Sequence, residues 1–144
     1  MVEILVVDDN LNDLNLILRA FKECCPADTI TVVRDGAAAL DFLFGNGTLT
    51  HPRLANLPRL VLLDLKLPKV GGLEVLKRIK ADPRTRSIPV VVLTSSSQEH
   101  DVAECYRLGA NSYILKPTEF RQFMEAVVQV AKYWLPLNNT FAKM

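Results

Sequence analysis

The chain is poor in the residues that build disulfide or zinc scaffolds. Its 144 residues include three cysteines, Cys24, Cys25 and Cys105, and two histidines, His51 and His100. An odd cysteine count without a Cys-x-x-Cys pair argues against a disulfide framework. The histidines lie far from each other and from the cysteines in sequence, which argues against a zinc site. Free thiols are typical of a reducing compartment, so we expect a cytoplasmic protein.

The chain also has no excess of one charge and no long apolar run. Its 17 Lys and Arg residues and 16 Asp and Glu residues give a net charge of +1, which offers no basic surface for nucleic acid. No stretch approaches the ~20 apolar residues of a membrane-spanning helix, so we expect no membrane segment and no signal peptide. The composition predicts one compact domain at 1–135, a C-terminal tail at 136–144 and no attached output module.

What the sequence does contain is an alternation of two kinds of apolar segment. Runs that are apolar at successive positions predict strands covered on both faces, at 4–7, 30–33, 60–63, 90–93 and 113–115. Segments with apolar residues three or four positions apart predict helices, at 11–21, 38–43, 73–79, 102–106 and 120–134. This alternation predicts a doubly wound α/β fold, with a five-stranded parallel sheet in the flavodoxin-like order 2-1-3-4-5 and five helices. We expect Thr118 to cap the last helix and Phe120 to lie in the core.

Polar side chains follow four of the five predicted strands. They are Asp8 and Asp9 after the first strand, Asp64 after the third, Thr94 at the end of the fourth and Lys116 after the fifth. The carboxyl ends of parallel strands meet at one edge of the sheet, which is where open α/β sheets bind their ligands. We therefore expect these side chains to lie close together.

The charges of this group predict a bound cation. Two carboxylates ~4 Å apart repel each other by about 4 kcal/mol at an effective dielectric constant near 20, so either one carboxyl group is protonated or a cation lies among them. Hard oxygen ligands with open coordination positions suit Mg²⁺. A carboxylate beside such an ion is a competent nucleophile toward phosphorus, with the ion and Lys116 offsetting the phosphoryl charge. Each residue alone also has an ordinary structural explanation, such as a helix N-cap for Asp8 or Asp9, so the prediction depends on the whole set.

Five segments resemble the receiver domain of response regulators in two-component signalling. They lie at 4–9, 62–68, 72, 92–95 and 113–117, and as a set they are highly specific over residues 2 to about 131. The resemblance implies that Asp64 accepts a phosphoryl group from a sensor histidine kinase. It also implies a stand-alone signalling protein rather than an enzyme, one that at most catalyses its own phosphorylation and dephosphorylation.

The resemblance further implies a site for Mg²⁺ or Mn²⁺. Asp9 and Asp64 would bind the ion directly, Asp8 would bind it through a water molecule, and the backbone carbonyl of Lys66 would be another ligand. The sequence departs from the family at Lys66, where many receivers carry Asn or another neutral residue, and at Ser96. Both positions flank the expected mouth of the pocket, so we predict that they modulate the lifetime of the acyl phosphate.

The resemblance also implies how phosphorylation would be read out. Lys116 and Thr94 would contact the phosphoryl group, and Thr94 and Tyr113 would form a switch pair in which Tyr113 rotates inward as Thr94 moves. The readout surface would comprise the fourth helix, the fifth strand and the fifth helix. A cis peptide bond between Lys116 and Pro117 is also implied.

Three further segments resemble the small response regulators that serve cyanobacterial phytochromes. They are the long loop before Arg59, the segment 67–69 and the segment 133–135. This narrower resemblance implies that the kinase is a phytochrome and that the chain forms a homodimer through the readout surface. The role of the loop at 45–58 is left open.

Other functions fit the sequence less well. A Mg²⁺-dependent phosphohydrolase with an aspartyl-phosphate intermediate often has a second acid two residues after its nucleophile, where this chain has Lys66. A receiver-like binding module that is not phosphorylated would not need the combination of Asp9, Asp64, Thr94 and Lys116. A nucleotide- or flavin-binding protein favours a glycine- or hydroxyl-rich loop after the first strand, where acids lie here.

Overall fold

The computed structural model describes residues 4–23, 25–26, 29–45 and 57–137. Strands and helices alternate along the chain as β1 (Ile4–Val7), α1 (Leu11–Phe21), β2 (Ile30–Val33), α2 (Gly36–Phe44), β3 (Leu60–Leu63), α3 (Gly72–Ala81), β4 (Val90–Thr94), α4 (Glu99–Arg107), β5 (Ser112–Leu115) and α5 (Phe120–Lys132). A short π-helical turn, η3 (Tyr133–Leu137), follows α5. Most of the predicted loop at 45–58 and of the predicted tail at 136–144 lies outside the described residues.

All five strands pair in parallel in the order β2-β1-β3-β4-β5, which confirms the predicted doubly wound sheet. Alternate residues of the central strands point to opposite faces, as the period of two in a strand requires. Ile4 and Val6 of β1 belong to one apolar cluster, and Leu5 and Val7 belong to the other. Both clusters are buried, which is why these strands are apolar at every position.

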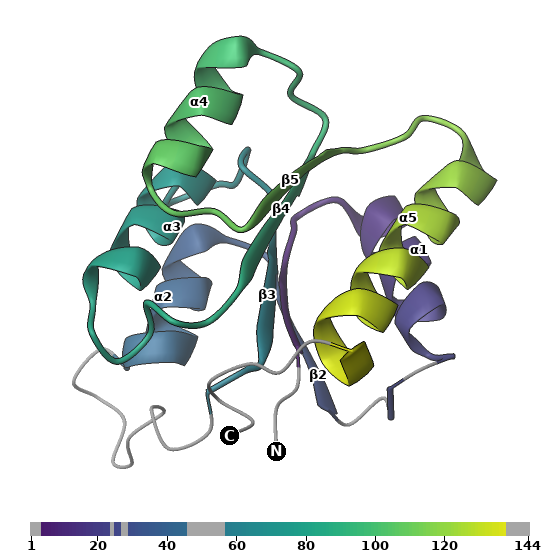
Figure 1. Ribbon diagram of the computed structural model, residues 1–144, viewed down its shortest axis with the longest axis horizontal. Helices are drawn as coiled ribbons and strands as arrows, with labels where there is room; N and C mark the ends of the chain where they lie inside the picture. Colours follow the sequence, from purple (N-terminus) through teal and green to yellow (C-terminus); the bar gives the residue numbers. More distant parts are fainter. Residues whose placement is uncertain (1–3, 24, 27–28, 46–56, 138–144) are drawn as a thin grey trace.

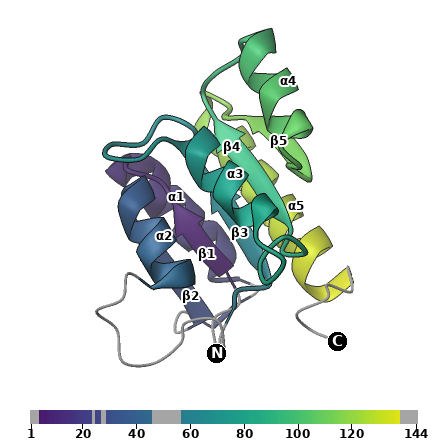
Figure 2. The same ribbon diagram turned by 90° about the vertical axis from the view of Figure 1, so that its left-hand side faces the viewer.

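Each face of the sheet has its own set of helices (Figures 1 and 2). α1 and α5 pack together over one face, and their buried residues Ile17, Phe21 and Val127 join the first cluster. α2, α3 and α4 cover the other face, where Leu43 and Ile79 join the second cluster. The carboxyl edge of the sheet stays open between the two layers, so residues that follow the strands can form a site there.

Local geometry corrects three details of the sequence-based prediction. The side chain of Glu119, not Thr118, caps α5 by accepting a hydrogen bond from the backbone N–H of Gln122. Phe120, the first residue of α5, is 50% exposed and does not lie in the core. The described residues contain no cis peptide bond, so the bond between Lys116 and Pro117 is trans. The trans form is the ordinary preference even before proline.

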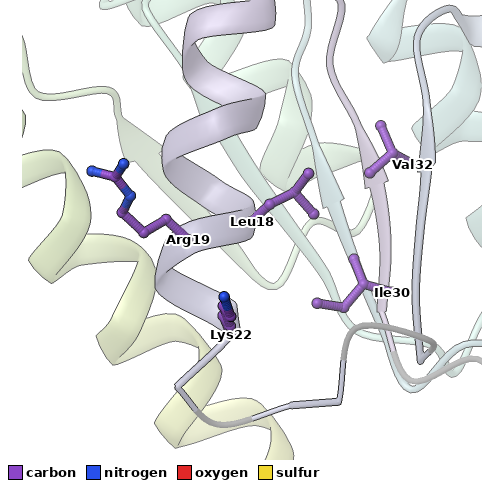
Figure 3. A pocket seen from close by; sticks show the side chains of 5 residues that line it. All are labelled: Leu18, Arg19, Lys22, Ile30 and Val32. Carbon is purple, nitrogen blue, oxygen red and sulfur yellow. The ribbon is translucent and has the colours of Figure 1, made fainter.

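An open groove runs between α1 and the edge strand β2 (Figure 3). Leu18, Ile30 and Val32 form its apolar walls, and Arg19 and Lys22 stand on the α1 side. The groove lies away from the polar carboxyl edge of the sheet. Among the described residues, no helix is both long and apolar enough to cross a membrane.

Candidate functional site

Three acidic side chains converge at the carboxyl edge of the sheet, as the sequence predicts. Asp8 and Asp9 follow β1, Asp64 follows β3, and one oxygen from each carboxylate lies within 4.8 Å of the other two. Backbone hydrogen bonds that continue the strand ladder fix the two loops, because the Asp64 N–H donates to Val7 and the Asp8 N–H donates to Val33. Asp8 and Asp64 are buried, whereas Asp9 is exposed.

The two buried carboxylates are each held at both oxygens. Asp8 Oδ1 accepts from the Asn10 N–H at 2.9 Å, and Asp64 Oδ1 accepts from the Leu65 N–H at 2.7 Å. The second oxygen of each accepts from Lys116 Nζ, at 2.9 Å for Asp8 and 3.0 Å for Asp64. A carboxylate held in this way has a fixed direction before any ligand arrives.

A fourth acid, Asp13, also contacts Lys116 and was not predicted. Its Oδ2 accepts from Lys116 Nζ at 2.8 Å, across 103 residues of sequence. The residue lies in the first turn of α1, where an acid already has an ordinary explanation in the helix dipole. The only sequence signal was its position, four residues after Asp9, and that signal does not indicate a contact with β5.

The pKa values of Asp8 and Lys116 are both raised in the folded chain. Burial raises the pKa of Asp8, and the charge of Asp64 adds to the rise, although hydrogen bonds from Lys116 and Asn10 oppose it. Burial alone would lower the pKa of Lys116, but its hydrogen bonds to Asp13 and Asp8, together with the nearby charges, hold that pKa above its ordinary value. Lys116 is therefore an ammonium ion at neutral pH, surrounded by more negative charge than it can balance.

This excess of negative charge fits a divalent cation. The ligands on offer are carboxylate oxygens, the hard donors that Mg²⁺ and Mn²⁺ prefer. Asp9 and Asp64 line an open cavity and Asp8 lies beside them, so an ion held by these acids would keep free positions for water or a phosphoryl oxygen. Asp13 is not one of these three residues, although its carboxylate also accepts from Lys116.

Only one of the two predicted mouth residues, Lys66, lines the cavity beside these acids. The cavity is lined by Asp9, Asn10, Asp13, Asp64, Lys66, Ser95, Lys116, Pro117, Thr118 and Phe123. Lys66 therefore lies where it was predicted, with an exposed side chain. Ser96 does not line this cavity, because its hydroxyl donates instead to Asp101 Oδ2 at 2.5 Å, toward α4. The neighbouring Ser95 occupies the place predicted for Ser96.

Thr94 and Tyr113 meet at the loop between β4 and α4. Thr94 is fully buried, and its Oγ1 accepts a long hydrogen bond of 3.4 Å from the Ser96 N–H. The Tyr113 hydroxyl donates to the carbonyl oxygen of Ser96 at 2.7 Å. Burial raises the pKa of Tyr113, against the effect of this hydrogen bond, so its hydroxyl keeps its proton at neutral pH. Both predicted switch residues thus contact the same loop residue.

A glycine at the start of α3 lets that helix pack against the Asp64 loop. A Cβ atom at Gly72 would lie 2.3 Å from the Asp64 carbonyl oxygen and 2.5 Å from Leu65 Cα, closer than any side chain can approach. The Gly72 N–H also donates to the Leu65 carbonyl oxygen at 2.9 Å. Only glycine fits this position without moving the loop that carries Asp64.

Comparisons with known proteins point to one family. Residues 4–128 match the response regulator receiver domain. The chain is 44% identical over 137 residues to a probable methanogenesis regulatory protein, FilR2, of Methanothrix harundinacea, with 95% of this chain and 86% of the relative covered. It is 39% identical over 133 residues to the response regulator Rcp1 of Synechocystis, with 92% of this chain and 88% of the relative covered.

Solved structures of similar proteins share the fold over nearly their full length. The Mn²⁺-bound form of Rcp1 matches with a TM-score of 0.86, covering 97% of this chain and 99% of that chain, at 35% identity. The phosphorylated cyanobacterial phytochrome response regulator RcpA matches with a TM-score of 0.84, covering 96% and 97%, at 35% identity. Receiver domains take a phosphoryl group from histidine kinases and bind Mg²⁺ or Mn²⁺ in an acidic pocket. Since the family match spans most of its length, the chain belongs to the response regulator receiver domains of two-component signalling.

Proposed function

We propose that this chain is a response regulator whose Asp64 accepts a phosphoryl group from a sensor histidine kinase. The observation that carries the proposal is the setting of Asp64. Its carboxylate lies beside Asp8 and Asp9, in contact with Lys116, at the wall of an open cavity. A nucleophile toward phosphorus needs such an arrangement, because charge on the incoming group must be offset on arrival.

In the proposed reaction, a carboxylate oxygen of Asp64 attacks the phosphorus atom of a phosphohistidine. The new O–P bond forms as the N–P bond breaks, and the histidine nitrogen leaves with the bonding electron pair. Asp9, Asp64 and the Lys66 carbonyl would hold Mg²⁺ or Mn²⁺ directly and Asp8 would hold it through water. The bound ion would offset the phosphoryl charge.

Two other residues of this chain would contact the phosphoryl group. Lys116 now donates one N–H to Asp64, and it would donate this N–H to a phosphoryl oxygen instead. Thr94 would donate its hydroxyl to another phosphoryl oxygen. This would change its contact with Ser96, the loop residue that Tyr113 also contacts. Phosphorylation would then favour one of two arrangements of this loop, Thr94 and Tyr113. Lys66, one of the residues that line the cavity, is proposed to modulate the lifetime of the acyl phosphate.

The partners are proposed from the relatives and from the surface. The likeness to RcpA, which is a phytochrome response regulator, supports a phytochrome as the kinase. Exposed apolar side chains on α4, β5 and α5, namely Tyr106, Leu115 and Phe120, are each about half exposed and support a homodimer through this surface. We propose a cytoplasmic location without nucleic-acid or membrane binding, in keeping with the buried cysteines Cys25 and Cys105, neither of which forms a disulfide.

The proposed phosphorylation is tested by intact mass measurement. Incubation with a small phosphodonor and Mg²⁺ is expected to add one phosphoryl group to the wild type and none to Asp64→Asn, and chelation of the metal is expected to prevent the addition. Asp82→Asn removes an acid that follows α3, outside the cavity, and should be phosphorylated like the wild type. Modification of Asp64→Asn at the wild-type rate would reject Asp64 as the acceptor. Continuous turnover of free phosphate esters would favour the phosphohydrolase instead.

A further inference from the structure

We propose that Asp13 is a positioning residue that holds Lys116 in place for phosphoryl acceptance. The inference deepens the proposed function and depends on it. Lys116 has three N–H donors, and the structure directs them to Asp8 at 2.9 Å, Asp13 at 2.8 Å and Asp64 at 3.0 Å. Its side chain is only 8% exposed, so water does not provide ready alternative partners.

The three carboxylates around Lys116 would bind different groups once a metal and a phosphoryl group are present. Asp8 and Asp64 belong to the group of acids that can hold a cation. A divalent ion there would attract both carboxylates and would also repel the ammonium group of Lys116. Asp13 lies outside that group, so its carboxylate stays available to Lys116 throughout the reaction.

The local structure of α1 fixes Asp13 for this contact. The N-cap residue Asn10 accepts a hydrogen bond from the Asp13 N–H at 3.0 Å, and the Asn10 N–H donates to Asp8 Oδ1 at 2.9 Å. Lys116 then closes the ring by bonding to Asp13 and Asp8. The start of α1, the end of β1 and the end of β5 are thereby joined at one ammonium group. A long, flexible lysine held in this way loses little further freedom when the phosphoryl group arrives.

The test compares the rate of phosphorylation by a small phosphodonor at saturating Mg²⁺, with the Mg²⁺ affinity of each variant titrated separately. Asp13→Asn is expected to lower this rate about tenfold, as loss of one charge-assisted hydrogen bond predicts. Because metal is saturating, the loss reflects the reaction and not weaker metal binding. A rate equal to or above that of the wild type would overturn the proposal, because Asp13 would then be idle or would compete with the phosphoryl group for Lys116.

Two further variants separate positioning from a general effect of charge or of helix stability. The first is the double variant Asn12→Asp with Asp13→Asn, an exchange that moves the acid by one position, so the first turn of α1 keeps one acid and the net charge is unchanged. Asn12 is suitable because it is exposed. The exchange is expected to be as slow as Asp13→Asn alone. In a Lys116→Met background, Asp13→Asn is expected to change the remaining rate by less than about twofold, because residues that act through each other are not additive.

Each outcome of these variants decides the question. Recovery of the wild-type rate by the exchange, or full additivity of the two single effects, would show that Asp13 acts through the helix or the overall charge and would reject the inference. Absence of phosphorylation on Asp64 in the wild type would instead reject the proposed function. The two failures are therefore distinguishable.

Discussion

The two edges of the sheet each hold a partly buried lysine, and the two lysines meet opposite surroundings. Lys116, at the carboxyl edge, donates to three carboxylates, and its pKa is held above the ordinary value. Lys80, on α3, donates at the amino edge to the carbonyl oxygens of Arg86 and Ile88 and to Asn111 Oδ1. Burial lowers its pKa from 10.5 to about 8.

The contrast shows that the number of hydrogen bonds does not define the role of a buried lysine. Both ammonium groups use three donors, but only Lys116 has charged acceptors. Three neutral acceptors tie α3 to the segments before β4 and β5, yet they leave the cost of burying the charge uncompensated. Three carboxylates overcompensate that cost and leave negative charge available for a metal. The same side chain serves structure at one edge and chemistry at the other.

The largest effect on stability is expected from Lys116→Met. Removing an ammonium group that contacts three carboxylates should destabilise the metal-free protein by about 3 kcal/mol, because a buried ion pair loses one partner. Added Mg²⁺ should recover most of this loss, since the ion no longer competes with an ammonium group for Asp8 and Asp64 and binds only the folded state. Urea denaturation with and without MgCl₂ measures both effects. If Mg²⁺ stabilised the variant no more than the wild type, the acids around Lys116 would not form the metal site.

The same substitution at the other lysine is expected to have a smaller effect. Lys80→Met removes three hydrogen bonds to neutral acceptors but also the cost of burying the charge, so the net change in the free energy of unfolding should be about 1 kcal/mol or less. Mg²⁺ should stabilise this variant as much as it stabilises the wild type, because no acceptor of Lys80 belongs to the acidic group. The denaturation series used for Lys116→Met provides the comparison, and an additional recovery by Mg²⁺ in Lys80→Met would contradict the distinction between the edges.

The smallest effect is a pH dependence that belongs to Lys80. Its pKa is about 8 in the folded chain and is expected at its ordinary value of 10.5 in the unfolded chain. Between these values the unfolded chain binds more protons at this position, so the free energy of unfolding should rise with pH through this window. Below pH 8 the cost of burying the charge is fully present. The difference in stability between the wild type and Lys80→Met, measured from pH 7 to about pH 11, isolates this contribution from other titrating groups.

Asn111→Asp provides the matched control for that measurement. It places a carboxylate 3.2 Å from Lys80 Nζ if the geometry is kept, which should raise the pKa of Lys80 and make the amino edge resemble the carboxyl edge. The rise in stability above pH 8 should then disappear. A rise of unchanged size would mean that another group titrates in this window.

A site residue could be predicted where its position in the local sequence pattern determines its place in the fold, and not where its role depends on a distant contact. Asp8, Asp64 and Lys116 directly follow strands, and the end of a strand is visible in the alternation of apolar runs. Asp13 was missed because its partner lies 103 residues away, and an acid in a first helical turn already has a local explanation. Ser96 was placed at the cavity because sequence gives its position but not the direction of its side chain, which points to Asp101.

The sequence by itself determined the succession of strands and helices along the chain, the two buried faces and the edge at which the acids gather. These follow from local periodicity and from the fixed hand of the crossover connections. Only the tertiary structure decided which charges surround each lysine, and hence which lysine can serve phosphoryl chemistry. The reason is physical: the field at one ammonium group sums contributions from β1, α1 and β3, segments that meet β5 only after folding.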